Sequence, residues 1–191
     1  MAVEIEAKMK LDNRAQLISR LQEIGSKPIA QIEELNTYFD TPNGDLKAAD
    51  EGLRIRTEKF SDGQVKTILT HKGPRAHGRL KSRTENEAEV TNAAHTTDLL
   101  KALGYTPVLT FEKKRERWEV DGCRVEIDQL PHLGDYIEIE GPNDDVVMSV
   151  RKKLNLGDQP LLKASYIAML STYLQEKHSV NIKEILFNET K

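Results

Sequence analysis

Acidic residues at alternate positions, in three segments far apart in the chain, most constrain what this sequence can fold into. The segments are Glu4-Ile5-Glu6, Glu85-Asn86-Glu87 and Glu138-Ile139-Glu140. In a β-strand, residues i and i+2 point to the same face, so each segment directs a pair of carboxylates to one side. Like charges on one face repel, and a fold gathers them at low cost only where water or a cation separates them.

Basic residues follow the same alternation. They occur in Arg54-Ile55-Arg56, in Lys113-Lys114-Arg115 and in the mixed segment Arg124-Val125-Glu126-Ile127-Asp128. In strands, Ile55, Val125 and Ile127 would then fall on the opposite, apolar face. The pattern predicts one polar surface with charges of both signs, suited to holding metal ions and a polyanion.

Composition sets the broad class of the protein. The chain has 191 residues, of which 38% are hydrophobic and 31% charged, as expected for a globular domain with a real core. A net charge of −3 argues against generic nucleic-acid binding. The single cysteine, Cys123, favours a reducing compartment. With no signal peptide or membrane-length apolar run visible, we expect a soluble cytoplasmic protein with no membrane partner.

Hydrophobic periodicity and turn residues predict the elements. Helices are expected from residue 12 or 13 to 24, and over 92–103, 144–154 and 162–177, and a flexible basic loop over 71–78. Residues 1–177 are expected to form a single domain, and 178–191 a tail that could pack as a short helix. Strands are expected over 2–11, 29–39, 53–59, 65–70, 82–90, 108–120, 124–130 and 135–141.

Eight strands with helices inserted between them predict an α+β fold with a mostly antiparallel sheet. If the sheet closes into a barrel, the charged faces line the lumen and the apolar faces form an outer wall that helices cover. Most small barrels fill their interior with apolar side chains, so this one would enclose a wet, charged tunnel.

The charged residues of the predicted inner face divide into two candidate sets. Carboxylate oxygens suit Mg²⁺ or Mn²⁺, whereas the scattered histidines show no zinc spacing. Arginine binds phosphate oxygens in bidentate fashion, and lysine acts as a movable point charge. An open alternative is an amphipathic sheet with a solvated charged face, whose bases pair with neighbouring acids. The candidate metal ligands are Glu4, Glu6, Glu85, Glu87, Asp128, Glu138 and Glu140. The candidate anion ligands are Lys8, Arg54, Arg56, Lys72, Arg83, Lys113 and Arg115, with Arg117 a weaker one.

Several motifs, taken in order, resemble the CYTH domain, the family of triphosphate tunnel metalloenzymes. The resemblance covers about residues 1–175, and its last two motifs are most similar to class IV adenylyl cyclases. The motifs are Glu4-x-Glu6-x-Lys8, Tyr38-x-Asp40, Leu53-Arg54-x-Arg56, Leu69-Thr70-x-Lys72-Gly73-Pro74, Arg83-x-Glu85-x-Glu87, Lys113-x-Arg115, Asp128, Gly134-Asp135-Tyr136-x-Glu138-x-Glu140 and Lys163-Ala164-Ser165-Tyr166.

The resemblance implies an eight-stranded antiparallel tunnel that binds a nucleoside or inorganic triphosphate with one or two Mg²⁺ or Mn²⁺ ions. It implies metal binding by the carboxylates named above. Family members cyclise ATP or hydrolyse inorganic or thiamine triphosphate, so the fold alone does not choose the reaction. A class IV-type adenylyl cyclase is the leading interpretation, a triphosphatase the alternative, and a non-catalytic binding module a third; a homodimer is open. The implied catalytic residues are Lys8, Arg54, Arg56, Lys72, Lys113 and Arg115, which with Arg83 would also bind the substrate.

Overall fold

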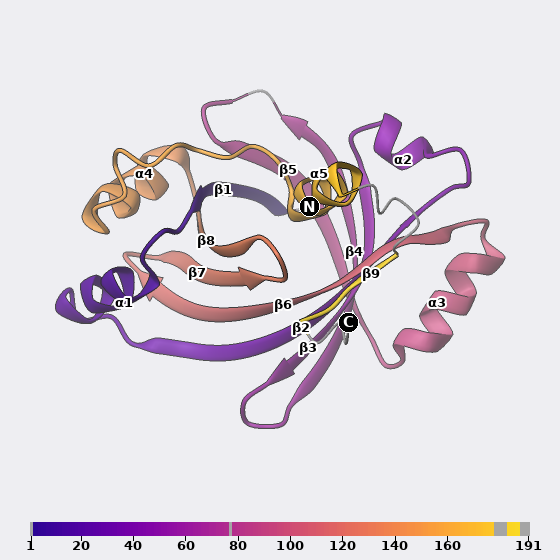
Figure 1. The fold of residues 1–191 in the computed structure, drawn as a ribbon, viewed down its shortest axis with the longest axis horizontal. Helices are drawn as coiled ribbons and strands as arrows, with labels where there is room; N and C mark the ends of the chain where they lie inside the picture. Colours follow the sequence, from indigo (N-terminus) through magenta and orange to yellow (C-terminus); the bar gives the residue numbers. More distant parts are fainter. Residues whose placement is uncertain (1, 77, 178–182, 188–191) are drawn as a thin grey trace.

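Nine strands run through the part of the chain that the computed structural model describes, which is residues 2–76, 78–177 and 183–187. They are β1 (Ala2–Lys10), β2 (Pro28–Asp40), β3 (Gly52–Phe60), β4 (Val65–Ala76), β5 (Lys81–Val90), β6 (Thr106–Val120), β7 (Cys123–Leu130), β8 (Gly134–Gly141) and β9 (Glu184–Ile185). The first eight pair antiparallel in the order β2-β3-β4-β5-β1-β8-β7-β6, and β6 pairs with β2 to close the ring (Figure 1). The predicted α+β barrel is confirmed.

Five helices connect or follow these strands. The side chains of Asn13, Asn92 and Asn143 each accept a hydrogen bond from a backbone N–H three residues later, so each stabilises the first turn of its helix. The helices are α1 (Arg14–Glu23), α2 (Asp45–Ala48), α3 (Ala93–Ala102), α4 (Asp144–Lys153) and α5 (Tyr166–Glu176).

The expected flexible loop over 71–78 is wrong for the residues that the structure describes. Strand β4 continues to Ala76 and stays paired with β5, across an irregularity between Lys72 and Arg75. Glycine and proline suggested a loop, but here they form a bulge in an otherwise continuous strand, a common place for both residues. Residue 77 lies outside the described part.

The C-terminal region also differs from expectation. The last helix begins at Tyr166 rather than at residue 162, because the N–H of Leu162 donates to the carbonyl of Lys8 and Ser165 caps the helix. Ile185 lies in the short strand β9, which runs parallel to β6, so the expected short helix is wrong there. Residues 178–182 and 188–191 of the predicted tail lie outside the described residues, and the division at residue 177 stays a prediction.

Apolar residues on the outer face of β1, β7 and β8 form the main core, and α1 and α4 cover them (Figure 1). Ala7, Val125 and Ile139 lie on this face and are at most 1% exposed, with Val147 and Val150 of α4 packed against the same cluster. A smaller cluster joins α3 to β3 through Leu100 and Ile55. The predicted apolar outer wall is confirmed, and it turns the alternate, charged residues inward.

One end of the lumen is apolar rather than charged. Phe111 and Tyr136 precede lumen-facing Lys113 and Glu138 by two residues, so they share the inner face, and α5 packs on them through Leu170. Phe111 is buried at this end, and Trp118 packs in the outer core, as expected for packing residues. Helix α5 therefore covers one end of the barrel and places its first residue, Tyr166, beside the charged interior.

Within the described ranges, no helix is both long and apolar enough to cross a membrane.

Candidate functional site

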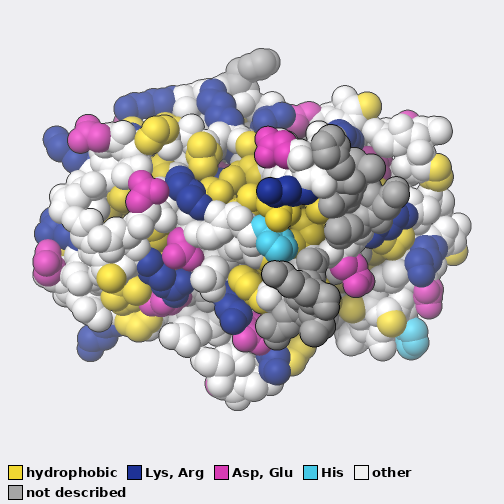
Figure 2. All heavy atoms as spheres, viewed as in Figure 1, with side chains coloured by type: hydrophobic (Ala, Val, Ile, Leu, Met, Phe, Trp, Pro, Cys, Tyr) yellow, Lys and Arg dark blue, Asp and Glu magenta, His cyan; other side chains and the backbone are white. Residues whose placement is uncertain are grey.

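The lumen of the barrel is a single cavity of about 1410 Å³, reached by side chains from most of its strands. It exceeds the roughly 300–1,000 Å³ of an ordinary small-molecule pocket. Charges of both signs line it. On the face of the molecule shown in Figure 2, Lys/Arg and Asp/Glu side chains are interspersed rather than gathered by sign. A strong local field for an anion is therefore expected inside the barrel rather than on this face.

The acidic wall of the cavity is built by β1, β5 and β8. Glu6 is directly opposite Glu140, and Lys8 is opposite Glu138, across the antiparallel β1–β8 pair. Opposed residues of such a pair point to the same face, so the Glu6 and Glu140 carboxylates are brought together by the register itself. On the other side of β1, Glu4 is opposite Arg83 of β5.

Two carboxylates of this wall have raised pKa values although each has a basic neighbour, Lys72 at 3.4 Å from Glu4 and Arg124 at 3.3 Å from Glu140. Burial raises the pKa of Glu140 to about 7, and the charge of Glu4 adds to the effect. Burial likewise raises the pKa of Glu4, which also shares a hydrogen bond with Glu85. Crowded carboxylates whose ionised forms are disfavoured are suited to hold a divalent cation, which would relieve the repulsion.

The cationic wall lies on β3, β4 and β5. Arg54 is 7% exposed, and its Nε is buried without a hydrogen-bond partner among the described residues. Arg83 is 9% exposed and its Nε is likewise unpartnered there. The Lys72 ammonium contacts Glu85 and lies 3.4 Å from Glu4. Buried guanidinium groups with spare donors have the chemistry to bind phosphate oxygens.

Two glutamates of β5 beside this wall, Glu85 and Glu87, differ in their exposure to solvent. Arg56 Nη2 lies 3.7 Å from Glu87 Oε1, and the same Glu87 oxygen accepts a 2.8 Å hydrogen bond from Thr70 Oγ1. Glu87 is 42% exposed, whereas Glu85 is 10% exposed. Glu87 therefore lies at an opening of the cavity, and Glu85 further inside.

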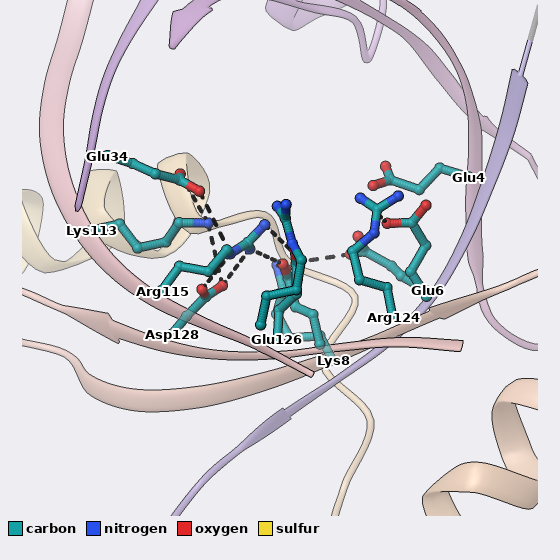
Figure 3. A network of polar contacts seen from close by, with 12 residues as sticks. Glu4, Glu6, Lys8, Glu34, Lys113, Arg115, Arg124, Glu126 and Asp128 are labelled. Atoms are coloured by element: carbon teal, nitrogen blue, oxygen red, sulfur yellow. Dashed lines mark hydrogen bonds and ion pairs between the residues drawn. The ribbon is translucent and has the colours of Figure 1, made fainter. Parts of the chain in front are cut away.

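Every member of a second group of lumen charges has an ion-pair partner, although Glu34 Oε1 has no hydrogen-bond partner among the described residues. We call Glu34, Lys113, Arg115, Glu126 and Asp128 the closed cluster (Figure 3). Arg115 donates to both Asp128 oxygens at 2.6 Å and contacts Glu126, and Lys113 lies 3.1 Å from Glu34. Burial opposes the ionisation of Glu34, but Lys113 and Arg115 outweigh it and lower the pKa of Glu34. These charges compensate one another in a nearly water-free place.

Lys8 and Tyr166 connect the closed cluster with the acidic wall. The Lys8 ammonium lies 3.0 Å from Glu138 and 3.9 Å from the centre of the Tyr166 ring, an arrangement in which the ring face also attracts the cation. Burial lowers the pKa of Lys8, but Glu138 and Glu6 outweigh it and the net direction is upward. Arg115 also donates to Glu138 at 2.7 Å.

The residues predicted from the sequence are brought together, with two exceptions. Asp128 does not line the open cavity but lies behind Lys113 and Arg115, with its side chain 0% exposed. Arg117 pairs with Glu126 at 2.9 Å, beyond the cavity lining. The roles of all these residues stay predictions. The predicted residues that line the one cavity are Glu4, Glu6, Lys8, Arg54, Arg56, Lys72, Arg83, Glu85, Glu87, Lys113, Arg115, Glu138 and Glu140.

Several lumen charges were missed by the sequence analysis. Glu34 and Glu58 continue the alternation of polar residues along β2 and β3, Glu126 lies between the two residues already singled out on β7, and Lys81 lies 2.6 Å from Glu6. The alternation of polar and apolar residues along the strands could have identified them. It could not have identified Asp50, which lies in a turn before β3 with a positive φ of 58° and lines the cavity rim.

The carboxylate oxygens of the cavity are suitable ligands for a hard divalent cation, although they do not converge on one point in this structure. In the described part of the chain, no three Asp, Glu, His or Cys side chains converge as a group that could hold a metal ion. The carboxylates are turned instead toward Lys8, Lys72 and Lys81. Mg²⁺ commonly uses one or two protein carboxylates and takes its other ligands from water and substrate phosphates, so Glu4 and Glu140, with Glu6 adjacent, suffice for such a site.

The comparisons with known proteins agree with this geometry. The model of the CYTH domain family matches residues 2–162. A provisionally named adenylate cyclase of Methanocaldococcus jannaschii is 28% identical over 176 residues, covering 87% of this chain and 98% of that protein. The adenylate cyclase CyaB of Aeromonas hydrophila is 34% identical over 113 residues, covering 59% of this chain and 54% of that protein. Among solved structures, the PH1819 protein of Pyrococcus horikoshii OT3 gives a TM-score of 0.78 at 27% identity, covering 89% of this chain and 99% of that one. This chain belongs to the CYTH domain family.

Proposed function

We propose that this protein is a metal-dependent enzyme that acts on a triphosphate inside the barrel, and that it converts ATP to cyclic AMP and pyrophosphate. One observation carries the proposal: in a single 1410 Å³ cavity, carboxylates of β1 and β8 with raised pKa values share the lumen with guanidinium groups of β3 and β5 whose Nε atoms have no hydrogen-bond partner among the described residues. A polyphosphate with a divalent cation is the ligand that satisfies both sets at once.

The side chains of this lumen divide the work of the reaction. Arg54, Arg83 and Lys72 would bind the phosphate chain and offset the negative charge that builds on the bridging oxygen as pyrophosphate leaves. Glu4, Glu6 and Glu140 would hold the divalent cation. Once bound, that ion supplies charge neutralisation and lowers the pKa of a nearby hydroxyl, so no side-chain base is required.

An apolar edge of the same cavity supports a nucleotide as the substrate. Leu46 of α2, Val108 of β6 and Ile167 of α5 line the cavity together with the cations, and Val108 is 40% exposed. A large exposed apolar side chain in a charged tunnel is a contact surface for an organic group, such as a nucleobase.

Product analysis tests the reaction directly. Purified protein is incubated with ATP and either Mg²⁺ or Mn²⁺, and the nucleotide and phosphate products are separated by chromatography. The proposal predicts cyclic AMP and pyrophosphate in equal amounts. Orthophosphate without cyclic AMP would overturn the cyclase assignment and leave the triphosphate site in place.

Hydrolysis of a triphosphate is the second candidate, and the aromatic side chains of the lumen favour it. The Tyr38 ring has Arg54 5.8 Å from its centre and stacks on Phe111, while Tyr166 carries Lys8 on one face and meets Tyr136 edge-on. Both rings are thus already in contact with a cation and another ring, which favours a substrate that needs no aromatic surface for a base. Proteins of this fold include a named adenylate cyclase and one with a dominant triphosphatase activity. Tripolyphosphate and thiamine triphosphate in the same assay would reveal this activity as orthophosphate release.

A non-catalytic polyphosphate-binding module would use the same cations without the acidic wall. Replacing Glu4 and Glu6 by glutamine separates this function from an enzyme. An enzyme should lose turnover in the double variant, whereas a pure binder should keep its affinity for tripolyphosphate in the presence of a chelator. Thermal shift with tripolyphosphate provides the binding readout, because a ligand that binds only the folded state raises the melting temperature.

A further inference from the structure

Two arginines at the rim of the cavity share one carboxylate. Asp50 accepts hydrogen bonds from the backbone N–H of Arg75 at 3.0 Å and from its Nε at 2.8 Å. Arg83 Nη2 lies 3.6 Å from the other Asp50 oxygen. All three residues line the cavity. Two positive charges therefore have a single negative partner here, and the Arg83 Nε remains without one among the described residues.

A bulge in β4 turns Arg75 toward the lumen. Lys72 pairs with Glu85 and Arg75 with Arg83, so Gly73 and Pro74 together lie opposite one residue, Thr84. Regular alternation from lumen-facing Lys72 would turn Arg75 outward, and the extra residue reverses that. A Cβ on Gly73 would lie 2.4 Å from Thr84 Oγ1, so a larger residue at this point of the bulge would force the Thr84 hydroxyl to move.

The basic side chains of this wall form a row from the rim of the cavity to its interior. Arg75 and Asp50 are 45% and 41% exposed, whereas the Arg83 and Lys72 side chains are 9% and 15% exposed. Lys72 of β4 is opposite Gly52 of β3, two residues from Arg54, so the Lys72 and Arg54 side chains are diagonal neighbours on the inner face. They lie at the inner end of this row of cations. A chain of phosphates bound by the inner cations would meet Arg83 and then Arg75 as it approaches the opening.

We propose that Arg75 and Arg83, held by Asp50, form an outer anion subsite that binds a phosphoryl group beyond the three bound further inside. The subsite rests on the proposed function, because it extends the same phosphate chain. It predicts that the tunnel prefers a tetraphosphate to a triphosphate. Asp50 occupies part of this subsite, so it limits affinity for the fourth phosphate while it keeps both arginines in place.

The test compares tripolyphosphate with tetrapolyphosphate by isothermal titration calorimetry, first with chelator and then at a matched free Mg²⁺ concentration. We expect tetrapolyphosphate to bind the wild-type protein about tenfold more tightly, a typical gain for one charge-assisted contact with a phosphate. Arg75→Gln should abolish this preference and leave tripolyphosphate affinity within about twofold. The matched control is Arg79→Gln, because Arg79 is exposed and lies outside the cavity lining.

The Asp50→Asn variant tests whether Asp50 competes with the fourth phosphate for the two arginines or only holds the rim in place. Asparagine tolerates the positive φ at this position and keeps a hydrogen-bond acceptor, so the turn should persist. The variant should bind tetrapolyphosphate more tightly than the wild type does, with tripolyphosphate affinity little changed. Weaker binding of both chains would show that Asp50 only holds the rim, and would overturn its role as a competitor.

The remaining outcomes distinguish a failure of the proposed function from a failure of the outer subsite. If tripolyphosphate binds in neither condition, the proposed function fails and the subsite with it. If tripolyphosphate binds and the fourth phosphate adds nothing, the subsite alone fails. ATP and adenosine 5′-tetraphosphate form a second pair of ligands. A gain for the fourth phosphate in both pairs places the chain end at the rim, whereas a gain only for the inorganic pair places the nucleoside there.

Discussion

The two regions of the lumen differ in how completely their charges are paired. In the closed cluster, every described side chain has an ion-pair partner, and none of the five is more than 6% exposed at the side chain. In the remainder, which we call the open half and which contains Glu4, Arg54, Lys72, Arg83 and Glu140, the Nε atoms of two buried arginines have no hydrogen-bond partner among the described residues. The closed cluster has no such basic nitrogen in the described part of the chain; its one orphan atom is an acceptor, Glu34 Oε1. Burial raises the pKa of Glu4 and Glu140 in the open half and that of Asp128 in the closed cluster.

From this difference we infer that the charges of the lumen have two roles, one in stability and one in binding. In the closed cluster every lysine and arginine nitrogen that is buried is engaged by the described residues, so its charges hold neighbouring strands together, and removing one member leaves buried charges with less compensation. An unsaturated half keeps binding capacity at some cost in stability. Lys113 and Arg115 were predicted as substrate ligands, and the comparison predicts that stability depends on Arg115 more than on any cation of the open half.

The largest expected effect is on stability, in Arg115→Met. Arg115 contacts Glu34, Glu126, Asp128 and Glu138, so its loss leaves buried carboxylates without compensation. We expect the free energy of unfolding to fall by about 3–5 kcal/mol, which lowers the melting temperature by about 10 °C. Calorimetry or circular dichroism measures the change.

Arg117→Met is the matched control for that variant. Arg117 lies two residues further along the same strand and pairs with the same Glu126, but its side chain is 22% exposed. Its loss should cost under about 1 kcal/mol. Equal destabilisation by both variants would show that the closed cluster has no special structural role.

Arg54→Met is the counterpart in the open half and should affect function rather than stability. Its guanidinium has one long hydrogen bond, 3.4 Å to Asn36, and an unpartnered Nε. Losing a charge-assisted phosphate contact should reduce kcat/KM for the triphosphate about a hundredfold, or about 2.7 kcal/mol. The melting temperature without ligand should change little. A variant that keeps its activity and loses its stability would reverse the comparison.

The sequence predicted the fold well because its signals were local and periodic. Alternation of Glu4 with Ile5 and of Glu138 with Ile139 specifies strands with one charged and one apolar face, and once such strands close, only the inner face is available for the charges. Asn13, Asn92 and Asn143 fixed helix starts through local caps. These features depend on neighbouring residues alone.

What the sequence could not give depends on contacts between distant elements. The Gly73-Pro74 bulge is read as a loop unless the pairing with Thr84 is known. Asp50 is held at the rim by a hydrogen bond from the backbone N–H of Arg75 in β4, a contact between segments 25 residues apart. The partition of the charges into a closed cluster and an open half depends on which acid meets which base across the lumen, and single-strand alternation does not specify that.

A smaller effect is expected in the pH dependence of stability, through Glu140 of the open half. The pKa of Glu140 is about 7 in the folded protein against 4.5 normally, because of burial and the charge of Glu4. A raised pKa of an acid means that folding favours the protonated form, so its stabilising contribution is present below about pH 4.5 and is lost as the pH rises through about 7.

Glu140→Gln fixes this side chain in a neutral form, so we compare melting temperatures of variant and wild type in the presence of chelator. The two should agree near pH 5, and the variant should melt a few degrees higher above pH 8. A discount for partial exposure leaves about 1 kcal/mol for this effect. If the difference between the two proteins stays constant with pH, the acidic wall is not under-compensated.

The smallest expected effect is in Tyr166→Phe, at the boundary between the two regions. The ring lies against Lys8 and is 5.4 Å from Lys113. The buried hydroxyl makes no hydrogen bond of ordinary geometry with the described residues, although burial and the nearby charge of Asp128 raise its pKa. Phenylalanine keeps the ring and removes only an unsatisfied polar group, so stability should stay within about 0.5 kcal/mol or rise slightly. Tyr166→Leu, which removes the aromatic face as well, should cost more, because Lys8 then loses its cation–π contact. A large loss in the phenylalanine variant would mean that the hydroxyl belongs to the closed cluster, through a bond to a carboxylate such as Asp128. The closed cluster would then extend to the start of α5.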